Sequence, residues 1–315
     1  MVALMSVMNE RPEQSDIEEV ASIKGIAASF VEKDWFVTRT IGIIAEIQYN
    51  DFEVIFSGGT ALSKAHNLIQ RFSEDVDFRV VTPETGNNRK ALSAFKTQVV
   101  ETLRQSGFTI AENQIKAQNQ NRFFSIELDY ESYFSQDDAL RPHIQIEMTV
   151  KGLQLPHIFR PVSSFLHEVA NRPPEVAKIG CIDPVESAAD KLSAIAWRIP
   201  DRVRGGQYDD PSLVRHIHDL AKLKGQAMAH SDFHALVAAS MQEDRSRARN
   251  DRAISELTIT EKFQRILQVL ESDREYIKEY DRFVKGLSYA TEGNTPDFAE
   301  AIEAVRALTI AAVRE

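Results

Sequence analysis

Apolar and polar residues alternate along five stretches of the chain, near 52–57, 76–81, 108–115, 123–130 and 143–150. Because successive side chains of a strand face opposite ways, this alternation predicts five strands. Apolar residues at helical spacing predict two helices before the first strand and one helix, at about 89–106, between the second and the third. After the last of these strands the pattern becomes helical.

Three regions follow from this order of elements. Residues 1–14 are predicted to be disordered, and Ser15-Asp16-Ile17-Glu18 opens the first helix as a capping box. Residues 15–160 hold the N-terminal helices and the strands, and residues 161–315 are predicted to form a helical domain. The order predicts an α+β protein.

The second strand carries two acidic side chains on one face. In the sequence DVDFRV, residues 75–80, the valines and Phe78 face one way, so Asp75 and Asp77 share the other face. Neighbouring carboxylates repel unless a divalent cation lies between them, and Mg²⁺ takes one or two carboxylates together with substrate phosphates. The pair therefore predicts a magnesium site.

A glycine turn comes before this strand. The first strand runs into Ser57-Gly58-Gly59-Thr60, and residues 61–68 read as a short helix with Thr60 as its N-cap. Glycine lets the backbone approach a phosphate, and free N–H groups at a helix start bind it, which makes Gly58, Gly59 and Thr60 candidate nucleotide-binding residues. A lone Gly-Gly is usually only a turn and a lone Asp-x-Asp usually solvated surface, so the prediction rests on their combination. The Walker and dinucleotide-binding glycine motifs are absent.

These motifs resemble a known family. GGTALSK followed by RFSEDVDF, with VEKDWFVTRTI upstream, is similar to the AbiEii/AbiGii toxins, a branch of the polymerase-β-like nucleotidyltransferases found in bacterial toxin–antitoxin and phage-abortive systems. The fifteen residues between Gly59 and Asp75 suit this branch rather than a generic antibiotic nucleotidyltransferase. The resemblance implies a nucleotidyltransferase core with a mixed sheet over 15–160 and a C-terminal helical domain over 161–315. It also implies Mg²⁺, an NTP substrate, an RNA acceptor (the tRNA 3′ end), a block of translation, and a cognate antitoxin.

The resemblance further implies a third metal-binding carboxylate on a later strand. Glu147 stands on the polar face of the strand at 143–150, and Asp129 on that of the strand at 123–130. We favour Glu147, because the family places its third acid on the strand before the helical half, although an exposed strand face would explain either residue. Ser73 is expected to face the nucleotide, and Asp75 and Asp77 to be catalytic.

The helical half contains a second candidate cluster. Asp183-Pro184-Val185-Glu186 is a capping box with proline at the first helical position, which gives Glu186 a structural role. The following Ala-Asp-Lys-Leu matches the family pattern, and by that match Lys191 is catalytic and binds the triphosphate; without the motif it would read as a solvated lysine. Asp190 is expected to be exposed.

A further match lies at RHIHDL, residues 215–220, which fits the family's Arg-Asp-x-x-Asp-Leu region only in part. Asp219 is carried over as a catalytic residue, whereas His216 stands where the first aspartate is expected. His216 and His218 are two residues apart on a helix, so they do not share a face for a metal ion.

Composition narrows the possible partners. With 315 residues and 43% hydrophobic content, the chain can bury a sizeable core. A single cysteine, Cys181, argues against disulfides and a cysteine zinc site, and the sequence has no basic leader or long apolar run, which predicts a cytoplasmic protein without a membrane partner. The net charge of −10 argues against broad nucleic-acid binding. The densest positive runs, either local RNA contacts or solvated loops, contain Arg202 and Arg204 and then Arg245, Arg247, Arg249 and Arg252.

Two other functions stay open. The same chemistry could modify a small molecule or a protein, or the fold could serve as a non-catalytic binding module. Intact Asp75, Asp77 and Lys191 argue against the module. The sequence does not identify the NTP, the acceptor or the antitoxin.

Overall fold

A computed structural model describes residues 11–83, 88–135, 140–206, 209–245, 252–289 and 294–313. The chain forms two compact units, each with its own core. The first comprises the residues up to Asn67 and those from Phe72 to Ile182, and the second comprises Leu68–Arg71 and the residues from Asp183 onwards. In the described ranges no helix is long and apolar enough to cross a membrane.

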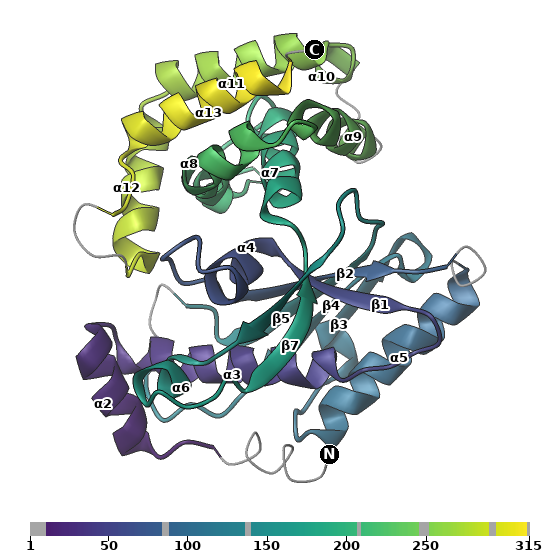
Figure 1. The fold of residues 1–315 in the computed structure, drawn as a ribbon, viewed down its shortest axis with the longest axis vertical. Coiled ribbons are helices and arrows are strands. Elements are labelled where there is room, and N and C mark those ends of the chain that lie inside the picture. The colour runs from purple at the N-terminus through teal and green to yellow at the C-terminus, as the bar shows by residue number, and fades with distance from the viewer. Residues whose placement is uncertain are drawn as a thin grey trace. The chain divides into compact units, whose positions relative to one another are not determined.

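A seven-stranded mixed sheet forms the centre of the first unit, in the order β3-β4-β5-β2-β1-β7-β6 (Figure 1). β2 pairs in parallel with β5 and antiparallel with β1, and β1 in turn pairs in parallel with β7. Four strands lie where the alternation predicts them, so the α+β prediction is confirmed. The strands are β1 Glu53–Ser57, β2 Asp75–Val81, β3 Ile115–Gln118, β4 Phe123–Asp129, β5 His143–Val150, β6 Ile158–Val162 and β7 Val176–Cys181.

The strand predicted at 108–115 is wrong. This stretch is a loop followed by a 3-10 turn, Glu112–Gln114, and β3 begins only at Ile115. Phe108 and Ile110 are both 5% exposed, so their alternation reflects loop side chains that pack into the core.

The expectation of helices alone after residue 160 also needs correction. β6 runs to Val162 and β7 spans Val176–Cys181, with the short helix α6, Phe165–Val169, between them. β6 contains Pro161, which an edge strand tolerates because the backbone N–H that proline lacks is not needed for pairing there. The sheet of the first unit therefore continues well beyond residue 161.

Two long helices, α3 and α5, contribute to the core of the first unit with the apolar face of the sheet (Figure 1). On β2, Val76, Phe78 and Val80 are at most 1% exposed, as the alternation predicts. The first of the two helices predicted ahead of β1, α2, is also present. The helices of this unit are α2 Gln14–Lys24, α3 Ala28–Ala45, the turn α4 Gly58–Thr60, α5 Arg89–Gln105 and α6.

The start of α2 differs from its prediction. The helix begins at Gln14, and the N-cap residue Glu13 makes no capping hydrogen bond through its side chain, so the capping box at Ser15 does not form. Just ahead of it, Arg11 pairs with Glu32 at 2.7 Å. The rest of the segment predicted to be disordered, residues 1–10, lies outside the described residues.

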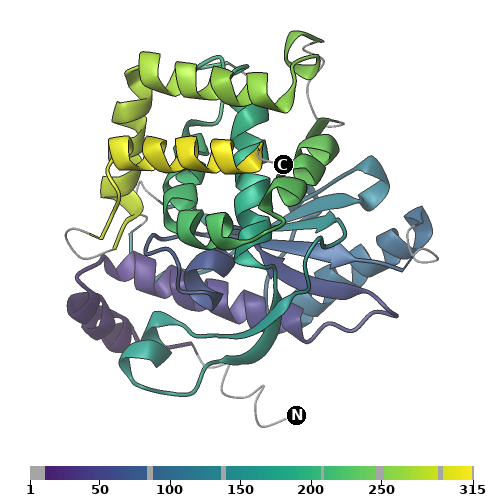
Figure 2. The same ribbon diagram turned by 45° about the horizontal axis from the view of Figure 1, so that its top comes forward.

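The second unit is built of helices from Asp183 onwards. α7 packs against α8 and α9, and α13 packs against α8 (Figures 1 and 2). Asp183 caps α7 by accepting a hydrogen bond from the Val185 N–H at 2.7 Å. The helices are α7 Pro184–Arg198, α8 Val214–Ala229, α9 Phe233–Arg245, α10 Arg252–Ser255, α11 Ile259–Ser272, α12 Glu275–Leu287 and α13 Phe298–Ala312.

Candidate active site

The acidic face of β2 has a third carboxylate beside it. Asp77 is the register partner of Glu147 on the parallel strand β5, so their side chains project from the same face of the sheet. Asp129, on β4, is the register partner of His143 on β5, and β5 lies between β4 and β2. The Asp129 carboxylate accepts a hydrogen bond from Gln114 at 2.7 Å. Of the two candidates, Glu147 is the one next to the aspartate pair.

Gly58 is fitted closely to Asp77. Ser57, the last residue of β1, is the register partner of Asp77, and Gly58 follows with φ +74°. A Cβ atom on Gly58 would lie 1.9 Å from Asp77 Oδ2, so any larger residue would displace the carboxylate. The glycine turn therefore makes room for the acidic pair and adopts a backbone conformation that favours glycine.

Thr60 has a different place from the one predicted. The helical turn begins at Gly58 and continues as a π-helical turn, Ala61–Ala65, so Thr60 lies inside it and Ser57 is the N-cap residue. The buried Thr60 hydroxyl donates to the backbone carbonyl of Asp75 and lies 2.9 Å from Ser73 Oγ. Thr60 thus holds the first residue of β2 in place and does not cap the start of a helix.

Asp75 also has a protein cation beside it. The Arg141 guanidinium donates to Asp75 Oδ1. Among the described residues, no three histidine, cysteine or acidic side chains are gathered closely enough to hold a metal ion. The donor set of Asp75 and Asp77 still fits Mg²⁺, which needs only one or two carboxylates when phosphate oxygens and water complete its shell.

Lys191 and Asp219 meet in the second unit. Asp219, on α8, is fully buried, and its Oδ2 lies 2.9 Å from Lys191 Nζ on α7. Arg71 completes the cluster by donating from Nε to Oδ1 at 2.8 Å and from Nη2 to Oδ2 at 2.7 Å. Both oxygens of Asp219 are thus occupied by protein cations, which gives it the geometry of a positioning residue.

The cations of this cluster determine the protonation state of Asp219. Burial alone would raise the pKa of Asp219, but Arg71 and Lys191 outweigh it and hold that pKa well below its usual range. Burial lowers the pKa of Lys191, while Asp219 acts in the opposite direction. The Asp219 carboxylate is therefore charged and holds both cations in place.

His216, at the position where the family pattern has an aspartate, is close to this cluster on α8. Burial lowers the pKa of His216 well below its ordinary value, and the charges of Lys191 and Arg215 lower it further. Both ring nitrogens are buried and have no hydrogen-bond partner among the described residues. The imidazole is therefore neutral at neutral pH.

Sequence reasoning missed Arg71 and misplaced Asp190. Arg71 lies within RFSEDVDF, but nothing local marks it, because its partner is 148 residues away. Asp190, expected on an exposed face, is half-buried and accepts a hydrogen bond from Ser240 on α9 at 2.9 Å. It joins α7 to α9.

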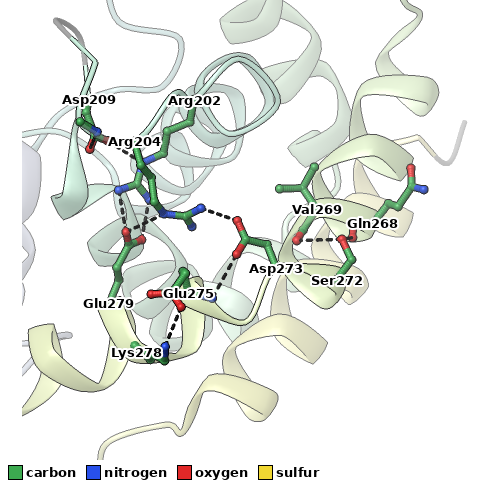
Figure 3. Close-up of polar contacts among 11 residues, drawn as sticks. Arg202, Arg204, Asp209, Gln268, Val269, Ser272, Asp273, Glu275, Lys278 and Glu279 are labelled. Carbon is green, nitrogen blue, oxygen red and sulfur yellow. Dashed lines mark hydrogen bonds and ion pairs between the residues drawn. The ribbon is translucent and has the colours of Figure 1, made fainter.

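Arg202 and Arg204, the first of the two basic runs, form ion pairs inside the second unit (Figure 3). Arg202 pairs with Asp209 at 2.8 Å and with Glu279 on α12 at 2.9 Å, and Arg204 pairs with Glu279 at 2.9 Å and with Asp273. These ion pairs argue against the RNA contact considered for Arg202 and Arg204. In the second run Arg245 is exposed at the end of α9, and Arg247, Arg249 and the side chain of Arg252 lie outside the described residues.

Two carboxylates beside a glycine turn on a mixed sheet, with a separate lysine cluster, are features expected of a nucleotidyltransferase. The family model of the AbiEii nucleotidyl transferase toxin, of type IV toxin–antitoxin systems, matches residues 48–304. The chain belongs to this family and is a nucleotidyltransferase toxin. The match starts before β1 and ends within α13, so it spans both units.

Comparisons with curated proteins and with solved structures add little to this family assignment. No curated protein matches the sequence significantly. Among solved structures, the chain is similar to MenT4, a nucleotidyltransferase toxin from Mycobacterium tuberculosis, with 15% identity and a TM-score of 0.39, over 85% of this chain and 98% of that one.

Proposed function

We propose that the protein transfers a nucleotide from an NTP to an RNA acceptor, the 3′ end of tRNA, and thereby blocks translation in the cytoplasm until a cognate antitoxin counters it. The proposal includes Mg²⁺ held by Asp75 and Asp77, with Glu147 as the third carboxylate. The observation that carries it is the acidic row on β2 and β5, where Asp77 lies beside both Glu147 and the Gly58 turn.

The residues of the first unit would hold the metal and the reacting phosphate. Bound Mg²⁺ would lower the pKa of the acceptor hydroxyl and offset the charge of the triphosphate. Asp75 and Asp77 supply oxygen ligands, and the Thr60 hydroxyl keeps the Asp75 backbone in place. Gly58 would offer half-buried backbone to a phosphate beside the Asp77 carboxylate, whereas Gly59 is buried.

Lys191 would contribute the positive charge that binds the triphosphate. Asp219 holds the ammonium of Lys191 at 2.9 Å, and the bidentate pair with Arg71 fixes Asp219 itself. The ammonium of Lys191 would donate a charge-assisted hydrogen bond to a phosphate oxygen. Asp219 would contribute to nucleotide transfer only by positioning the ammonium of Lys191.

Support for an RNA acceptor comes from the resemblance to toxins of this family. The net charge of −10 favours a short, defined contact with the acceptor over extensive binding of its backbone. A small molecule or a protein is the alternative acceptor, and a binding module without catalysis is the remaining alternative.

The deciding experiment is incubation with each α-labelled NTP, Mg²⁺ and total tRNA. We expect one or more NTPs to label tRNA at the 3′ end, and EDTA, Asp75→Asn or Asp77→Asn to abolish labelling. Wild type that labels no tRNA with any of the four NTPs would refute the RNA acceptor, and labelling of cell extract would then test small molecules and proteins.

Growth provides a second test. Expression without an antitoxin should slow growth, and Asp75→Asn or Asp77→Asn should relieve this while the protein stays folded by circular dichroism. The substitution removes a metal-binding charge and keeps the side-chain shape. If a folded Asp75→Asn variant still blocks growth, the toxicity comes from binding rather than transfer.

A further inference from the structure

Arg141 brings a partly exposed cation to the acidic face of the first unit. It lies two residues before β5, and its guanidinium donates from Nη1 to Asp75 Oδ1. Its Nε is 3.9 Å from Glu74 Oε1, and 44% of its side chain is exposed. A cation thus stands at a carboxylate that would ligate the metal ion, with part of its surface open to a ligand.

The backbone of Arg141 is held on both sides. Its N–H donates to Glu74 Oε2 at 2.9 Å, and its carbonyl oxygen accepts from Lys33 Nζ at 2.6 Å. Lys33, on α3, also pairs with Glu74, and its side chain is fully buried. Burying an ammonium is costly unless it is paired, and Glu74 supplies that pairing for Lys33. We call Lys33 and Glu74 the clamp, because together they hold the backbone of Arg141.

The clamp sets where the guanidinium can reach. The carbonyl and the N–H of Arg141 are fixed by groups from α3 and from the residue before β2, so the side chain starts from a fixed point next to Asp75. A metal ion that takes Asp75 competes with the guanidinium for the same carboxylate. Guanidinium also binds phosphate oxygens through two parallel hydrogen bonds, which a lysine cannot do.

We propose that Arg141 is a phosphate-contacting residue that exchanges partners: it pairs with Asp75 in the free protein and with the triphosphate of the NTP when a divalent cation occupies Asp75. This inference rests on the proposed function. Arg141 would act as a placeholder for the metal and then as a clamp on the substrate, so it would weaken metal binding without NTP and strengthen NTP binding with metal.

The test measures these two opposite effects in the full chain. Arg141→Ala and Arg141→Lys are compared with wild type and with Arg104→Ala, which removes an arginine of α5 that forms ion pairs with the exposed Glu101 and Glu112. Mn²⁺ affinity is measured by electron paramagnetic resonance without nucleotide, and affinity for a non-hydrolysable NTP by calorimetry with Mn²⁺ present. Thermal melting checks that each variant is folded.

We expect Arg141→Ala to bind Mn²⁺ more tightly by a few fold and the NTP analogue more weakly by about tenfold, the worth of a lost charged hydrogen bond. Arg141→Lys should recover only part of the affinity for the NTP analogue. Arg104→Ala should change neither the Mn²⁺ affinity nor the affinity for the analogue. If wild type binds the analogue and Arg141→Ala binds it equally well, Arg141 is only a counter-ion and the inference fails alone.

The remaining outcomes are also decisive. A folded Arg141→Ala variant that loses affinity for both Mn²⁺ and the analogue would assign Arg141 a structural role and overturn the exchange. If wild type binds no NTP analogue with Mn²⁺, the proposed function fails together with this inference. Should Arg141→Ala not fold, the same two affinities of Arg141→Lys decide, because the lysine keeps the charge and loses the bidentate contact.

Discussion

Arg71 and Asp219 form a buried two-point ion pair, although 148 residues separate them in the chain. Arg71 comes from the short segment Leu68–Arg71 and Asp219 from α8, and both belong to the second unit. Because Lys191 bonds to the same carboxylate, this pair determines where the proposed triphosphate-binding lysine can lie.

Removing Asp219 should destabilise the protein strongly. Asp219→Ala leaves Arg71 and Lys191 buried without their shared partner, and breaking a buried pair in this way costs about 3–5 kcal/mol. Urea denaturation measures the change in the free energy of unfolding. The exposed Asp232→Ala is the control, with an expected change within about 0.5 kcal/mol. A similar small effect for Asp219→Ala would contradict its anchoring role.

Lys191→Ala should lower activity with little effect on folding. Asp219 keeps its bidentate bond to Arg71 in this variant, so no carboxylate is left unpaired. Loss of a phosphate contact from the transition state should reduce the rate of nucleotide transfer by about a hundredfold or more. The control is Lys178→Ala, which removes an exposed lysine over the Phe159 ring. Equal rates for the two variants would return Lys191 to the status of an ordinary helical lysine.

Gly58→Ala and Gly25→Ala separate backbone strain from a clash at the site. Both glycines have positive φ, +74° and +66°, so each substitution should cost about 1–2 kcal/mol of stability. The Cβ atom added at Gly58 would meet the Asp77 side chain, whereas a Cβ atom added at Gly25 would have no other described side chain or backbone within 4 Å. We expect Gly58→Ala alone to lose Mn²⁺ binding and nucleotide transfer. Full activity of Gly58→Ala would show that the position of Asp77 is not critical.

His216 should make the protein less stable in mild acid. Its folded-state pKa lies well below the ordinary value of 6.5, so below this pH the unfolded chain binds a proton that the folded chain does not. The free energy of unfolding should therefore fall as the pH drops below about 6.5, by up to about 1.4 kcal/mol per pH unit from this group.

Urea denaturation between about pH 7.5 and 5 checks this slope. His216→Asn should flatten the profile, because it removes the group whose proton uptake differs between the two states. The exposed His234→Asn should leave the profile as in wild type. Identical slopes for His216→Asn and wild type would exclude His216 as the source of the acid sensitivity.

The sequence by itself determined the features that depend on neighbouring residues. Alternation within residues 75–80 placed Val76 and Phe78 in the core and both aspartates on the other face. Asp183 and the proline after it specified the start of α7, because a cap needs only its own helix turn. The glycine turn and RFSEDVDF were enough to indicate the family that the match over residues 48–304 establishes.

The tertiary structure decided everything that depends on residues far apart in the chain. The loop at 108–115 resembles a strand in sequence because packing into a core also requires apolar side chains. β7 acquires strand structure by pairing with β1, and β6 does so by pairing with β7. The choice of Glu147 over Asp129 as neighbour of Asp77 came from strand order, and Thr60 found its acceptor on β2 rather than in its own helix. Arg71 and Arg141 acquire their roles only through their carboxylate partners, since a local sequence pattern carries no information about which distant side chain folding will bring within hydrogen-bond distance.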